Sequence, residues 1–285
     1  MMEVVSLIWH NVLIKPWFLI WISVVIAFYA IRRWLQIRKH ASARTTQIEQ
    51  LTPLANELGG TVVGPEGATA WSAGLQRPME RVLSGIDRIE QRSVPKFDLA
   101  LDFQRGPWHV RVSEASVRKA LAGNDAVQYE QEHRIEVATV RLAPMKILRP
   151  LRSGLSGPKS PKFMQKQRFE GWASEPPQTV EHEQCEWHHI ALMPPMDEEF
   201  YVYGEDIAAA QRNLDADALK WLLSRQQGLP MMAQHMRLTI EAGIVYTTIA
   251  DHIYPENILF VVDTIVGLLD RMPDMRPRHP AAAAL

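Results

Sequence analysis

The sequence predicts an α+β fold in which an N-terminal transmembrane helix is followed by a mainly antiparallel sheet with packed helices. Three observations predict it. An uncharged apolar run covers residues 16–31. Apolar and polar residues alternate over residues 97–104 and again over 108–113, which is typical of neighbouring strands with one face in water. Residues 255–272 carry an apolar stripe at helical spacing, which is typical of a helix packed on a sheet.

The apolar run is interpreted as a membrane anchor. A span needs about 20 residues, and Trp34 and Leu35 extend the run if Arg32 and Arg33 reach the headgroups. The basic cluster follows the run, and Ala27 and Ala30 do not form an A-x-A site, so a cleaved signal peptide is not expected.

The flanking charges predict the orientation. Five basic residues follow the run before the first acid, Glu49, whereas only Lys15 precedes it. The positive-inside rule then places the N-terminus outside and the C-terminal domain in the cytoplasm of a bacterial inner membrane. The single cysteine, Cys185, forms no internal disulfide, which agrees with a reducing compartment.

Four parts are expected along the 285 residues. Residues 1–35 form an interfacial segment and the anchor, and residues 36–52 a juxtamembrane linker. A cytoplasmic α+β domain covers residues 53–272 and includes a mobile basic loop at about 149–165, where proline, glycine and serine are frequent. The proline- and alanine-rich tail, residues 273–285, is expected to be disordered.

The elements of the domain follow in order. Pro53 disfavours one unbroken helix from the membrane and predicts a new short helix over 53–58, which ends at Gly59-Gly60. Residues 127–142 are expected to form a further strand pair or one long bulged strand, with Ile135 and Val137 on one face. The other face carries charged residues, namely Glu130, Glu132, Arg134 and Glu136. The remaining expected elements are a strand at 61–63, a helix at 78–91, a strand at 199–203, helices at 207–212 and 215–223, and a hairpin at 236–249.

The chain resembles a broad group of bacterial single-pass, membrane-anchored proteins whose activity is not established. The similar segments are LANELGG at residues 54–60 and the stretch from EFYVYGED to the closing helix, residues 199–271. The resemblance implies a compact α+β domain on a membrane stalk and carries over no catalytic residues.

One stretch, EHEQCEWHH at residues 181–189, contains candidate metal ligands. They are His182, Cys185, His188 and His189. Their spacing matches no standard zinc motif, and as a strand the segment puts Cys185 and His189 on one face and His182 and His188 on the other. A surface strand is the favoured interpretation, and a metal-binding enzyme or sensor that uses the cluster at 181–189, with zinc as the candidate metal, is kept as an alternative.

Charge is divided along the chain. Residues 141–168 contain eight basic residues and no acid, and residues 170–206 contain ten acids and no Lys or Arg. The candidate lipid- or partner-binding residues in the basic block are Arg149, Arg152, Lys159, Lys162, Lys166 and Arg168. Each basic side chain near an anionic leaflet gains about 1 kcal/mol, so an anionic-lipid sensor is a second alternative.

These observations predict a binding or scaffold component of a membrane assembly, in contact with lipid and a membrane-protein partner. Nucleic acid is not expected as a partner, because the net charge is −1 and few aromatic residues interleave the basic block. No catalytic residue is assigned and no cofactor is expected. Asp98 and Asp102, on a half-exposed strand, are interpreted as solvated side chains.

Overall fold

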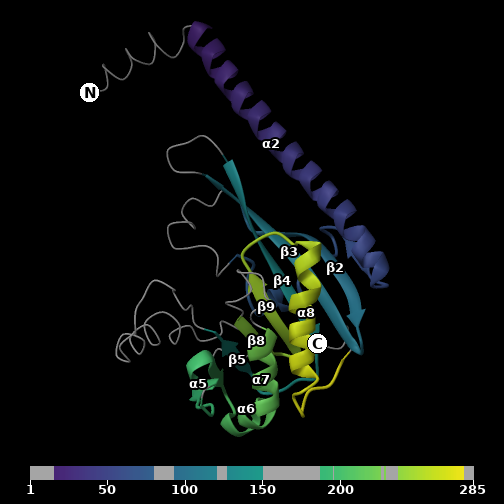
Figure 1. The fold of residues 1–285 in the computed structure, drawn as a ribbon. Coiled ribbons are helices and arrows are strands. Elements are labelled where there is room, and N and C mark those ends of the chain that lie inside the picture. The colour runs from purple at the N-terminus through teal and green to yellow at the C-terminus, as the bar shows by residue number, and fades with distance from the viewer. Residues whose placement is uncertain are drawn as a thin grey trace, which may run out of the picture. The chain divides into compact units, whose positions relative to one another are not determined.

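The computed structural model describes residues 16–79, 93–120, 127–149, 187–194, 196–225, 228 and 237–278 (Figure 1). The chain divides into two compact units, Met1–Glu49 and Gln50–Leu285. The predicted helix at 78–91 and the predicted basic loop at 149–165 both lie almost wholly outside the described residues.

The long helix α2 runs from Pro16 to Glu57 without interruption. The prediction that Pro53 breaks this helix is therefore wrong. Leu51 and Ala55, on either side of Pro53, are buried in the core of the second unit, and this packing offsets the backbone hydrogen bond that the proline cannot make. The expected linker 36–52 and the expected helix 53–58 are both parts of α2.

The N-terminal part of α2 exposes large apolar side chains around its whole circumference. Within the described residues, α2 is the one helix long and apolar enough to cross a membrane. The exposed apolar residues include Trp17, Leu19, Trp21, Val24, Phe28, Ile31, Trp34 and Ile37. Arg38 lies one turn beyond Trp34, with its guanidinium carbon 4.4 Å from the centroid of the indole ring.

The second unit is built on one sheet, which has nine strands in the described part of the chain, in the order β1-β2-β3-β4-β9-β8-β5-β7-β6. All the neighbouring strands pair antiparallel, as predicted. The strands are β1 (Thr61–Val63), β2 (Lys96–Arg105), β3 (Trp108–Ala120), β4 (Val127–Ala138), β5 (Met145–Leu148), β6 (His188–Ile190), β7 (Tyr201–Gly204), β8 (Arg237–Glu241) and β9 (Ile244–Ile249).

The helices α6 (Ile207–Asn213), α7 (Ala216–Arg225) and α8 (Pro255–Leu269) lie on one side of this sheet (Figure 1). Apolar residues of α8, including Val261, Ile265 and Leu268, are buried, as the helical stripe predicted. Two polar contacts position α8 on the sheet: Arg105 donates to Asp263, and Trp108 Nε1 donates to Asp270 Oδ1 at 2.8 Å. A short helix, α5 (Met196–Glu199), and the 3-10 helix η2 (Trp71–Gly74) complete the described elements.

The expected disorder of the C-terminal tail does not hold for residues 273–278. Met275 is buried, Pro277 bridges to Thr139, and Asp274 accepts hydrogen bonds from Arg212 and Asn213. These contacts order a proline-containing segment because it packs on the domain, which its composition does not reveal.

Candidate functional site

The most unusual feature of the domain is a row of polar residues that crosses the whole sheet. Directly paired residues lie on the same face, because side chains alternate along each strand. The pairings place one such residue on each of the nine described strands, from β1 at one edge of the sheet to β6 at the other. In this order they are Thr61, Asp102, Arg111, Glu136, Tyr246, Thr239, Lys146, Tyr203 and His189. This polar face is the one opposite α8, because Trp108, Val110 and Ile135 lie on the other.

On β4 this polar face is buried, whereas on β2 and β3, for which one face in water was predicted, Gln104 is exposed and Asp102 and Arg111 are partly exposed. Glu132, Arg134 and Glu136 of β4 all have no exposed surface. They recur at every second residue and therefore lie on one face of the strand. Burying three charges costs free energy unless each is hydrogen-bonded or paired, so their partners decide what the cluster does.

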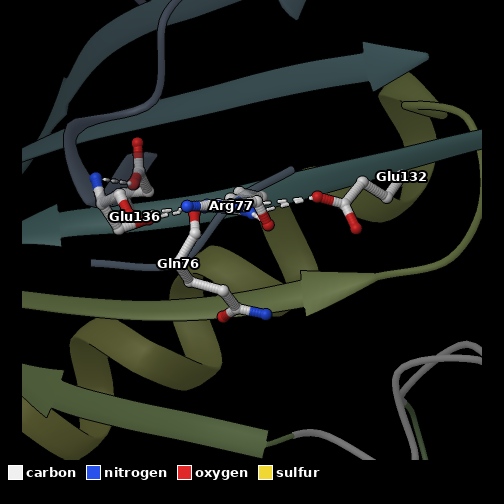
Figure 2. Close-up of polar contacts among 6 residues, drawn as sticks. Gln76, Arg77, Glu132 and Glu136 are labelled. Carbon is white, nitrogen blue, oxygen red and sulfur yellow. Dashed lines mark hydrogen bonds and ion pairs between the residues drawn. The ribbon is translucent and has the colours of Figure 1, made fainter. Parts of the chain in front are cut away.

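Arg134 has a full set of partners. Its Nη2 lies 3.1 Å from Glu132 Oε1 and donates to the carbonyl oxygen of Arg77 at 2.7 Å. Its Nη1 donates to the carbonyl oxygen of Gln76 at 2.7 Å. Figure 2 shows Glu132 and Glu136 on either side of Gln76 and Arg77.

Glu136 holds the other end of the same segment. Its two carboxylate oxygens accept the backbone N–H groups of Trp71 at 2.8 Å and Ser72 at 2.7 Å. Burial raises the pKa of the Glu136 carboxyl above its usual range, and the hydrogen bonds from Ser72 and Trp71 and the nearby Arg134 oppose that rise.

Together these residues attach residues 71–77 to the sheet. The acid binds N–H groups at the start of η2, and the arginine binds carbonyl groups just after its end, which matches the direction of the backbone dipoles. We name Glu132, Arg134 and Glu136 the β4 clamp. Arg134 and Glu136 bind the chain's own backbone and Glu132 pairs with Arg134, so in the described structure the role of the clamp is to position a segment.

A second polar cluster lies on the opposite face, near the start of α8. Glu114, which is 1% exposed, accepts the backbone N–H of Ile253 at 2.8 Å and lies 3.3 Å from Nδ1 of His252. The hydrogen bond with Glu114 raises the pKa of the partly exposed His252. His133 donates from Nδ1 to the carbonyl oxygen of Asp251 at 2.8 Å, and burial lowers its pKa. This cluster joins β3 and β4 to residues 251–253.

The candidate lipid-binding residues are only partly described. Arg149 makes an ion pair with Glu199 at 3.3 Å, with both side chains largely buried. The other five residues, Arg152, Lys159, Lys162, Lys166 and Arg168, lie outside the described residues.

The candidate metal ligands are not brought together where they are described. His188 pairs with Gly204 and His189 with Tyr203, so their side chains lie on opposite faces of β6. His189 contacts the ring of Tyr203, with 5.5 Å between the centroids. His182 and Cys185 are outside the described part, within which no group of three potential metal ligands is found.

The strand carboxylates Asp98 and Asp102 are engaged within the sheet rather than simply solvated. Asp102 makes a bidentate pair with Arg111, at 2.7 Å and 2.6 Å, and Asp98 accepts a hydrogen bond from Ser116. The residues of the β4 clamp were predicted to share one face of a strand, but their role was not predicted, although the pattern of charges is visible in the sequence. Opposite charges alternate at positions 132, 134 and 136, and the residues between and after them include the apolar Ile135 and Val137.

No family model and no curated protein matches this sequence. Among solved structures, the crystal structure of the mycobacterial trehalose monomycolate transport factor A, TtfA, is similar to it with a TM-score of 0.40 and 13% sequence identity. The alignment covers 81% of this chain and 98% of that chain. A TM-score of this size is a loose likeness, and the fold described above rests on the strand pairing of this chain.

We expect Glu136→Ala to destabilise the domain by about 3 kcal/mol, because it leaves the buried N–H of Ser72 and the partly buried N–H of Trp71 without acceptors and removes one charge of the β4 clamp. Denaturation of the full chain in detergent, followed by tryptophan fluorescence, measures this change. Glu66→Ala removes an exposed acid from a turn and serves as the control, with an expected change of less than about 0.5 kcal/mol. Equal effects of the two substitutions would contradict the clamp.

We expect His252→Gln to cost more stability at about pH 5.5 than at about pH 8.5, on either side of the ordinary imidazole pKa of about 6.5. The folded-state pKa of His252 is raised, so its contribution is fully present below the unfolded-state pKa and is lost as pH rises through the folded-state pKa. The buried His133, whose pKa is lowered, has the opposite effect but is present in both proteins.

The measurement is the difference in unfolding free energy between wild type and His252→Gln at each pH. Repeating it in a Glu114→Gln background should remove most of the pH dependence. A difference that is constant with pH, or unchanged without the Glu114 carboxylate, would show that the pair does not act in this way.

Proposed function

We propose that this chain is a membrane-anchored binding or scaffold component of a membrane assembly. The observation that carries the proposal is the apolar surface of α2. Trp17 is 79% exposed and Trp21 64% exposed in the protein alone, and the other large side chains of this part are also exposed. So much apolar surface on one helix is stable in lipid and costly in water.

Two features favour a retained anchor over a cleaved signal sequence. The basic residues follow the apolar run, and Ala27 and Ala30 do not form an A-x-A site. In addition, α2 continues to Glu57, where Leu51 and Ala55 belong to the core of the second unit. The helix that carries the apolar run is therefore also part of the folded domain.

The domain itself supports a binding role rather than catalysis. Arg134 and Glu136 of the β4 clamp, and Glu114 and His133 of the second cluster, bind backbone groups of the same chain, and Glu132 pairs with Arg134. Arg149 is paired with Glu199, so its charge is already offset within the domain. Lipid binding by the basic block is therefore less well supported than membrane attachment through α2. His188 and His189 lie on opposite faces of β6, which gives a zinc site at 181–189 no support from the described residues.

We further propose that the domain is cytoplasmic, because Arg32, Arg33, Arg38, Lys39 and Arg44 follow the apolar run. A cytoplasmic reporter fused after Leu285 should be active, and a reporter that requires export should be inactive. Replacing Arg32, Arg33, Arg38 and Lys39 by Gln should reduce this asymmetry, while the same number of Lys or Arg replacements within the domain should not. Activity of the exported reporter alone would overturn the orientation.

The binding role predicts a stoichiometric membrane-protein partner. Cross-linking in native membranes, followed by purification through a C-terminal tag and mass spectrometry, should recover it reproducibly. A matched chain in which residues 16–31 are replaced by an unrelated span of equal length tests whether the domain carries the interaction. If both chains are recovered without a partner, the scaffold proposal is wrong.

A further inference from the structure

Arg225, the last residue of α7, packs against two aromatic rings. Its guanidinium carbon lies 4.2 Å from the ring centroid of Phe260 and 5.3 Å from that of Trp221. Within the described residues its buried Nε has no hydrogen-bond partner, and its two Nη atoms are not among the buried unpaired atoms. Stacking uses the faces of a guanidinium, while the N–H groups point outward in its plane, where they match the two oxygens of a carboxylate.

The two rings are held in place by α8 and its neighbours. Trp221 Nε1 donates to the carbonyl oxygen of Thr264 at 3.0 Å, and its ring lies so close to Gly267 that an added Cβ would come 2.3 Å from Cζ2. The ring of Phe260 lies equally close to Gly228, where an added Cβ would be 2.4 Å from Cζ. These contacts preorganise the surface on which Arg225 lies.

Other arginines on nearby elements have acidic partners. Arg271 pairs with Asp217 at 3.4 Å, Arg212 with Asp274 at 2.9 Å, and Arg105 with Asp263 at 2.6 Å. No such partner of Arg225 is found in the described part of the chain. The C-terminus of a helix favours any cation, so the helix dipole explains a positive charge at position 225 but not a stacked guanidinium with a buried donor.

We propose that Arg225, Trp221 and Phe260, here named the arginine–aromatic patch, dock an acidic segment of a partner protein. A carboxylate of that segment accepts the N–H groups of the two Nη atoms of Arg225, and an adjacent apolar side chain contacts the ring of Phe260, because Arg271 already stacks on Trp221 at 4.1 Å. Arg225 lacks the acidic partner that Arg271, Arg212 and Arg105 have, so an acidic segment complements its charge. Arginine and tryptophan are also the side chains that most often dominate protein–protein binding. The inference rests on the proposed binding function and specifies the chemistry of the partner.

The test uses the full chain in detergent and a fluorescein-labelled peptide of alternating Glu and Leu, followed by fluorescence anisotropy. The same peptide with Gln in place of Glu corrects for association with the micelle. We expect Arg225→Gln to weaken binding of the acidic peptide about tenfold or more, and Arg225→Lys to weaken it less. Lys220 is an exposed residue of the same helix and serves as the control. Its replacement, Lys220→Gln, should change the affinity for the acidic peptide by no more than about twofold.

Three outcomes would overturn the proposal: no binding of the acidic peptide by the wild type, equal loss in Arg225→Gln and Lys220→Gln, or displacement of the peptide by inorganic phosphate as readily as by the unlabelled peptide. The last would indicate a simple anion site. Thermal unfolding of both variants checks that the fold is intact. This assay needs neither membrane nor orientation, so failure of the anchor or scaffold proposal in membranes remains distinguishable from failure of the patch.

Discussion

The antiparallel pairing of β3 with β4 is the constraint on which the domain depends. It runs from Val110↔Val137 to Ala120↔Val127 and decides which residues share each face. One face receives α8 through apolar residues such as Val112 and Ile135, and the other holds the β4 clamp. A shift of one residue would move Arg134 under α8 and Ile135 onto the polar face, so both faces specify the same register.

The buried polar face has an energetic cost that its contacts offset. Arg134 and Glu136 lose hydration but gain backbone partners at Ser72, Gln76 and Arg77, and these partners come from a segment with little regular structure. Apolar residues at these positions would bury as easily, but they would leave the same N–H and C=O groups of residues 71–77 without partners. The charges therefore select the path of this segment across the sheet.

The functional proposals draw on two surfaces with different chemistry. The apolar part of α2 fits lipid because it contains no charge between Trp17 and Ile31. The arginine–aromatic patch combines apolar rings with a guanidinium that has no acidic partner in the described part of the chain, which fits a partner with both an acid and an apolar side chain. Membrane attachment and partner binding thus belong to separate parts of the chain.

Local periodicity in the sequence by itself determined the apolar run of α2, the strands β2 and β3, the last hairpin and the stripe of α8. These features depend on residues close together in the chain. Only the tertiary structure decided that α2 continues through Pro53, because Leu51 and Ala55 are buried by distant residues. It likewise decided that the three charged residues of the β4 clamp are buried rather than exposed to water. It also decided that Arg225 stacks on the ring of Phe260. Each of these outcomes depends on contacts between distant segments, and alternation alone does not show which face another segment will cover.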